Sequence, residues 1–110
     1  MASKCKKKWK SILKPSTGGQ IEETIIIIND SSGVLKGAHQ ESGKGVDGSC
    51  LGSGMSLIRP DDNTFPRYIY SGDFVNGDED KVRGTYVVVN HVDSRLDAES
   101  GGDWEADKTT

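Results

Sequence analysis

Hydrophobic and polar residues alternate along most of the chain, which is typical of β-strands that bury one face and leave the other in water. Four consecutive isoleucines at 25–28 strengthen this pattern, because β-branched side chains favour an extended backbone. The pattern predicts strands over 9–13, 21–28, 34–40, 55–59, 67–75, 82–90 and 103–108. We expect the glycine-rich residues 42–54 to form a loop with at most a short strand, and Asn76-Gly77-Asp78 to form a hairpin turn.

A five-residue pattern recurs on these segments, in which a small residue lies midway between two large ones. It is clearest at 35–39, 70–74 and 82–86, and weaker at 9–13 and 104–108. Because side chains alternate along a strand, the two large residues and the small one share a face. A small residue in the middle of the inward face relieves crowding where a sheet curves tightly. We therefore predict an all-β fold: a small antiparallel up-and-down β-barrel of about eight short strands.

The composition fits one domain of this kind and restricts the classes of partner that we expect it to bind. The chain has 110 residues, 33% of them hydrophobic, and a formal net charge of -3. Lysines crowd positions 4–14, so we expect a flexible basic arm at 1–8 and a single barrel domain at 9–110. A net negative charge does not suit a general nucleic-acid binder, and we expect no nucleic-acid partner. Neither a long apolar run nor a signal peptide is evident, so we expect no membrane span and a cytoplasmic location.

The sequence shows no pattern of metal ligands, cofactor-binding residues or catalytic groups. Cys5 and Cys50 could form one disulfide, but without a secretory signal we expect two free thiols. Neither cysteine has a second cysteine or a histidine at ligand spacing, and His39 and His91 are isolated in the sequence. We therefore assign no metal site, no cofactor and no catalytic residue.

Several segments resemble the avidin-like proteins and, more broadly, the calycin or lipocalin-like group of small meander barrels. These segments are Trp9-x-Ser11-x-Leu13, residues 33–42, Gly84-Thr85-Tyr86 and residues 102–106. The resemblance implies an eight-stranded barrel. In avidin-like proteins an asparagine of the first strand and a tyrosine of the next hairpin bind the ureido oxygen of biotin, and Ser11 and His39 match these positions. Both can hydrogen-bond a ligand, but the family's further tryptophans have no counterpart between 55 and 90, which argues against biotin.

Aromatic residues on the predicted inward face could line a pocket. The residues predicted to point inward are Trp9, His39, Tyr70, Phe74, Tyr86 and Trp104. A barrel of eight strands is just wide enough to be filled by side chains or to hold one small ligand. Our first hypothesis is a non-catalytic binding module that holds a small, mostly apolar ligand at the barrel mouth. The residues nearest this ligand would be Trp9, Ser11, His39, Tyr86 and Trp104.

Two other hypotheses stay open. A solid barrel could be a structural or interaction module that acts through its outer face, its lysine arm or a homo-oligomer, and an exposed stretch at 87–89 would favour this. An enzyme could use His39 with a carboxylate from a distant strand, although no motif indicates one. A closed aromatic interior would count against both the ligand-binding and the enzymatic hypotheses.

Overall fold

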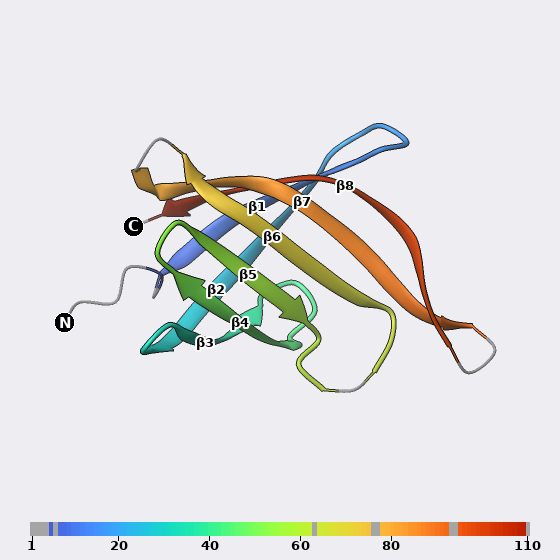
Figure 1. Ribbon diagram of the computed structural model, residues 1–110, viewed down its shortest axis with the longest axis horizontal. Coiled ribbons are helices and arrows are strands. Elements are labelled where there is room, and N and C mark those ends of the chain that lie inside the picture. Colours follow the sequence, from blue (N-terminus) through green and yellow to red (C-terminus); the bar gives the residue numbers. More distant parts are fainter. Residues whose placement is uncertain (1–4, 6, 63, 76–77, 93–94, 110) are drawn as a thin grey trace.

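The computed structural model describes residues 5, 7–62, 64–75, 78–92 and 95–109, which form one closed sheet of eight strands. The strands are β1 (Lys8–Pro15), β2 (Ile21–Ser31), β3 (Val34–His39), β4 (Gly45–Leu51), β5 (Gly54–Arg59), β6 (Arg67–Val75), β7 (Asp78–Val92) and β8 (Arg95–Thr109). Each strand pairs antiparallel with the next, and β8 pairs with β1 (Figure 1). The described residues form no helix that could cross a membrane. The predicted all-β, up-and-down barrel of eight strands is confirmed.

The strand β4 is longer than the glycine-rich sequence led us to expect. It occupies seven residues of the segment that we assigned mainly to a loop, and it pairs with both β3 and β5. Val46 and Cys50 point inward and are buried, whereas Asp47 between them is half-buried. The alternation of a strand is therefore present beneath the glycines, and hydrogen bonding to two neighbours outweighs the low strand propensity of glycine.

The last two strands are also longer than predicted. Both β7 and β8 have 15 residues. The strand β6 begins at Arg67, which pairs with Val89, and β7 continues beyond this point to Val92 while still paired with β8. The β7–β8 hairpin therefore extends past the barrel wall, as Figure 1 shows. Of the turn predicted at Asn76-Gly77-Asp78, the first two residues lie outside the described residues.

The inward faces of the strands form one packed core. Among the residues predicted to point inward, Trp9, His39, Tyr70, Tyr86 and Trp104 are buried, and Phe74 is partly buried against the core. In the predicted apolar stretch at 87–89, Val88 is buried with this core, while Val87 and Val89 are half-buried. An exposed stretch at 87–89, which would have favoured the interaction hypothesis, is therefore absent from the described wall.

The small residues of the five-residue pattern are needed because neighbouring strands approach closely. A Cβ atom added at Gly37 would lie 2.2 Å from the backbone oxygen of Ile26, and one added at Gly84 would lie 1.9 Å from that of Ser71. The atoms that exclude a side chain thus belong to the backbone of the next strand. Crowding between inward side chains, which we expected from the sequence, is not the main constraint at these two positions.

The two ends of the barrel differ. The described loop residues 16–20, 40–44, 60–62 and 64–66 lie at one end, which we call the mouth end (Figure 1). The other end carries the β2–β3 and β4–β5 hairpins and a disulfide between Cys5 and Cys50, and we call it the disulfide end. The expectation of two free thiols is therefore wrong. Cys5 belongs to the predicted basic arm, and the disulfide holds this residue against the barrel with no exposed surface.

Candidate functional site

A buried carboxylate, that of Glu23, lies at the centre of a polar network inside the mouth end of the barrel. Glu23 is on β2, where its backbone pairs with Ser11 of β1, and only 4% of it is exposed. The hydroxyl of Ser11 donates a hydrogen bond to Oε1 of Glu23 at 3.0 Å, and the phenol of Tyr70 donates to the same oxygen at 2.8 Å. An ionised carboxylate inside a protein needs such partners, because removing the charge from water costs several kcal/mol.

Arg59 supplies the opposite charge. Its Nη2 lies 3.1 Å from Oε2 of Glu23, and the two side chains are 14% and 3% exposed. Its Nε donates a hydrogen bond to the phenol oxygen of Tyr70. The guanidinium group also lies over the ring of Tyr68, 3.8 Å from the ring centroid, in a cation–π contact. Arg59 thus joins the buried network to an aromatic side chain that is only half-buried.

His39 extends the network from Glu23 toward solvent. Its Nε2 lies 2.7 Å from Oε2 of Glu23, and its Nδ1 lies 2.7 Å from the hydroxyl oxygen of Ser42. The backbone N–H of Ser42 donates to Nδ1 at 3.3 Å, so this nitrogen accepts and the proton belongs on Nε2. His39 is buried, whereas Ser42 is exposed in the 40–44 loop. A continuous hydrogen-bonded chain therefore connects the surface to the buried carboxylate.

Four of the five residues predicted to contact a ligand lie in or beside this network. Ser11 and His39 bond Glu23 directly, and the indole N–H of Trp104 donates to the hydroxyl of Ser11 at 2.8 Å. Tyr86 lies beside Tyr70, with 6.5 Å between ring centroids. The structure thus brings together Ser11, His39, Tyr86 and Trp104.

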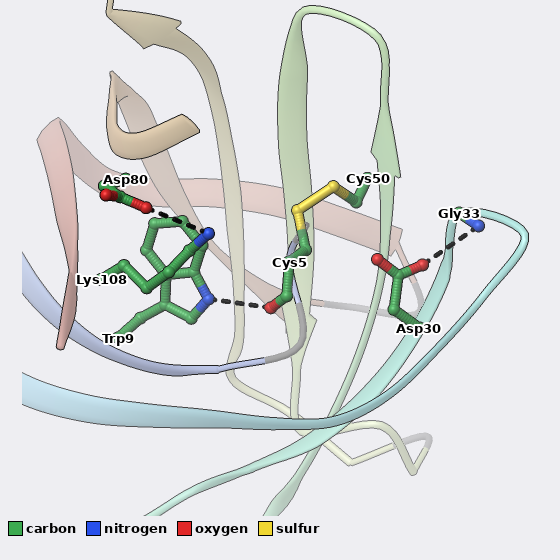
Figure 2. Close-up of a disulfide and its surroundings, with 7 residues drawn as sticks. All are labelled: Cys5, Trp9, Asp30, Gly33, Cys50, Asp80 and Lys108. Carbon is green, nitrogen blue, oxygen red and sulfur yellow. Dashed lines mark hydrogen bonds and ion pairs between the residues drawn. A yellow bond between two sulfur atoms is a disulfide. The ribbon is translucent and has the colours of Figure 1, made fainter. Parts of the chain in front are cut away.

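The fifth predicted residue, Trp9, lies at the opposite end of the barrel. Its indole N–H donates to the backbone oxygen of Cys5 at 3.0 Å (Figure 2). The amine of Lys108 lies 5.2 Å from the centroid of the Trp9 ring and 3.2 Å from Asp80. Trp9 therefore packs against the disulfide end and is separated from the mouth.

Sequence reasoning missed three members of the network: Glu23, Arg59 and Ser42. One signal was available for Glu23. It occupies the same inward-facing series as Ile25 and Ile27, and a charged residue at such a position needs a partner. Arg59 similarly follows Leu57 by two residues on β5. Ser42 follows His39 by three residues in a turn, and no periodicity marks it.

Burial sets the protonation of the two tyrosines. It raises the pKa of Tyr70 far above the usual 10.0, and the negative charge of Glu23 adds to this shift. Burial also raises the pKa of Tyr86, with further contributions from Tyr68 and Glu23. Tyr70 therefore keeps its proton into the alkaline range and still donates its hydrogen bond to Glu23 there.

Among the described residues, two hollows open mainly at the outer surface of the barrel, and each also touches one buried side chain. One, of about 450 Å³, is lined mainly by outward-facing residues of β1 and β2 together with Glu41, and it also touches the buried Glu23. The other, of about 300 Å³, is formed around Lys14 and Arg83 with residues 103–105 of β8. The polar network itself is packed among the aromatic side chains described above, which counts against a ligand or substrate held deep inside the barrel and leaves the rim of the mouth end as the place for one.

The comparisons with known proteins identify no relative. No family model matches the sequence, and neither a curated protein nor a solved structure shows significant similarity to it.

Because Glu23 and Arg59 form a buried ion pair, we expect a single substitution to destabilise the protein much more than a double substitution that removes both charges. Glu23→Gln should lower the free energy of unfolding by about 3 to 5 kcal/mol, because Arg59 keeps a buried charge without its partner. The double variant Glu23→Leu/Arg59→Met should lose much less than the sum of the single changes, since it removes both charges. Urea unfolding followed by circular dichroism measures both values. Glu22→Gln, on the exposed neighbour, is the control and should change stability by less than about 0.5 kcal/mol. Additive losses would contradict a buried pair.

The raised pKa of Tyr70 predicts a loss of stability in alkali. Because its pKa is higher in the folded than in the unfolded protein, the contribution of Tyr70 is complete below pH 10 and disappears as the pH rises above that value. Tyr70→Phe should cost about 1 kcal/mol near neutral pH, through the lost hydrogen bond. The variant should then lose less stability than the original protein above about pH 10. Parallel stability curves for the two proteins between neutral and alkaline pH would refute this role.

Proposed function

We propose that the protein is a non-catalytic binding module that holds a small, mostly apolar ligand with one polar group at the mouth of the barrel. The observation that carries this proposal is the convergence of Ser11, Glu23, His39, Arg59 and Tyr70, from five different strands, at one end of the core. Burying an ion pair is a poor way to gain stability, since apolar side chains of the same size often serve as well. A role in recognition explains why such a costly group of side chains lies there.

The chemistry of the mouth suggests how a ligand would be held. His39 and Tyr86 reach the rim with 6% and 7% of their surface exposed, and Tyr68 is half-buried beside Arg59. An apolar ring could pack on the two tyrosines while its polar group meets His39 or Arg59. Deeper entry would require Arg59 to leave the ring of Tyr68, which costs about 1 to 2 kcal/mol. Ser11 and Trp104 would then support the ligand from below.

The avidin-like or, more broadly, calycin relationship is part of the same proposal. The closed barrel of eight antiparallel strands is consistent with a calycin-like fold. Ser11 and His39, which match the positions where that family contacts its ligand, are both bonded to Glu23. Because Glu23 and Arg59 add an ion pair there, we expect a ligand whose polar group differs from the ureido group of biotin.

A fluorescence and melting screen tests the binding proposal. In Trp9→Phe the only remaining tryptophan is Trp104, and in Trp104→Phe it is Trp9 at the disulfide end. A mouth ligand from a panel of small aromatic and aliphatic acids, amides and alcohols should change the emission of the first variant and leave that of the second unchanged. It should also raise the melting temperature, since it binds only the folded state.

Two substitutions on β7 distinguish ligand binding at the mouth from ligand binding at the outer wall. Tyr86→Ala should weaken binding of such a ligand by about tenfold or more, equivalent to about 1.4 kcal/mol. Thr85→Ala, one residue away and exposed on the outside, should leave affinity unchanged. A ligand that perturbs Trp9 alone, or a panel without a saturable hit, would count against the mouth and favour the alternative of a solid barrel acting through its outer surface or by self-association.

The chain Ser42–His39–Glu23 supports a second candidate function, ester cleavage. The hydroxyl of Ser42 lies 2.7 Å from Nδ1 of His39, and Glu23 holds the opposite nitrogen at 2.7 Å. Ser42 would attack the acyl carbon and pass its proton to Nδ1, which then protonates the leaving alcohol before water releases the acyl group. Glu41 lies 3.7 Å from His39 and is negatively charged, so a neutral or cationic ester suits the site.

Covalent labelling tests this second function more sharply than turnover. The N–H of Gly43 donates to the backbone oxygen of His39, and the N–H of Lys44 donates to the hydroxyl oxygen of Ser42. These two groups are therefore not available to stabilise an oxyanion, and we expect slow turnover. A fluorophosphonate should nevertheless label Ser42, as found by peptide mass spectrometry. His39→Gln should slow labelling by about a hundredfold, whereas Ser53→Ala should not change it. Equal labelling of several serines would exclude an activated Ser42.

A further inference from the structure

Three groups able to bind a metal meet at the disulfide end of the barrel. Cys5 precedes β1, Asp30 lies near the end of β2 and Cys50 lies near the end of β4. Their two sulfur atoms and a carboxylate oxygen all lie within 4.8 Å of one another. Figure 2 shows the carboxylate of Asp30 beside Cys5, with one oxygen on the side of the disulfide. The backbone N–H of Gly33 donates to Oδ1 of Asp30 at 3.1 Å.

We propose that reduction of the disulfide converts this cluster into a binding site for a thiophilic divalent cation such as Zn²⁺. Two thiolates and one carboxylate are donors that Zn²⁺ accepts, and thiolates disfavour the hard cations Mg²⁺ and Ca²⁺. Tetrahedral Zn²⁺ with bonds of about 2.0 to 2.3 Å separates its ligand atoms by about 3.3 to 3.8 Å. Reduction lets the two bonded sulfurs move apart toward this spacing, the carboxylate oxygen of Asp30 already lies within 4.8 Å of both, and water would occupy the fourth position.

Contacts other than the disulfide keep the three ligands in place. The indole of Trp9 binds the backbone oxygen of Cys5, and the backbone N–H of Ile27 donates to the oxygen of Lys7 at 2.9 Å. The backbone N–H of Cys50 donates to the oxygen of Gly33 at 2.7 Å, and this is the glycine whose N–H binds Asp30. Breaking the bond between the sulfurs thus leaves each ligand attached to the barrel through hydrogen bonds.

The exchange between the two forms is chemically balanced. A dithiol reductant gives two electrons to the disulfide and becomes a disulfide itself, while Cys5 and Cys50 become thiols. The cation then replaces the two thiol protons, which pass to the buffer. With the disulfide intact, the sulfurs cannot act as thiolate ligands. The oxidised form suits an oxidising compartment, and the metal-bound form suits the reducing cytoplasm that we expected from the sequence.

Titration of the full chain with Co²⁺, a spectroscopic substitute for Zn²⁺, tests the proposal. The reduced protein should bind one equivalent and develop a sulfur-to-cobalt charge-transfer band together with the intense visible absorption of tetrahedral Co²⁺. One equivalent of Zn²⁺ should abolish both signals. The oxidised protein has the same sequence and serves as the matched control, and it should show neither signal.

Variants identify the ligands. Cys50→Ser should remove most of the charge-transfer band, and Asp30→Asn should weaken Co²⁺ binding to the reduced protein by about tenfold or more. Asp103→Asn, an exposed carboxylate elsewhere on the barrel, should leave the affinity unchanged. This site lies at the end opposite the mouth, so loss of metal binding and loss of ligand binding are independent results.

Three outcomes would overturn the proposal. One is a reduced protein that gives no thiolate band with Co²⁺, and another is equal affinity in Asp30→Asn and the original chain. The third outcome concerns folding, because only the folded barrel brings the three metal-ligating residues together. If near-ultraviolet circular dichroism shows the reduced chain unfolded both with and without Co²⁺, the barrel does not hold the site.

Discussion

The carboxylate of Glu23 is almost completely buried, and most of the mouth end is organised around that fact. Four side chains from other strands, Ser11, His39, Arg59 and Tyr70, hydrogen-bond or pair with its two oxygens. Three of them contact a further side chain: Ser11 binds Trp104, His39 binds Ser42, and Arg59 lies over the ring of Tyr68. Because a buried charge tolerates little displacement of its partners, this network specifies the relative positions of the strands more strictly than apolar packing alone.

Much of the fold follows from local patterns, whereas the site depends on contacts that local patterns do not record. The alternation of residues places Trp9, Ser11 and His39 on inward faces, and this could be predicted without any partner being known. The roles of these residues are set by distant partners: Trp104 is 93 positions from Ser11, and Tyr70 is 47 from Glu23. The expectation of free thiols at Cys5 and Cys50 rested on the missing secretory signal. The two residues, 45 apart in sequence, are instead brought together because β4 is a full strand.

The two ends of the barrel carry different chemistry on one scaffold. The mouth end holds a group of charged and polar side chains, for which we propose a ligand with one polar group. The disulfide end holds sulfur atoms and a carboxylate, for which we propose a soft cation once the disulfide is reduced. The apolar core between them includes Ile25, whose backbone pairs with both Trp9 and His39. The two proposed sites share no residue, which makes the two proposals separable by experiment.

The seam between β1 and β8 has a consequence for how the chain reaches this structure. It joins Lys8 to Thr109, almost the two limits of the described chain, while every other pairing in the wall joins consecutive strands. Hairpins between consecutive strands close short loops and can form early. The β1–β8 seam closes the longest loop, and the entropy cost of closing that loop is offset only when β1 meets a nearly complete wall. Until then β1 and β8 are open edges with unpaired backbone groups. The slowest step of folding is thus also the step that ends the risk of pairing with another molecule.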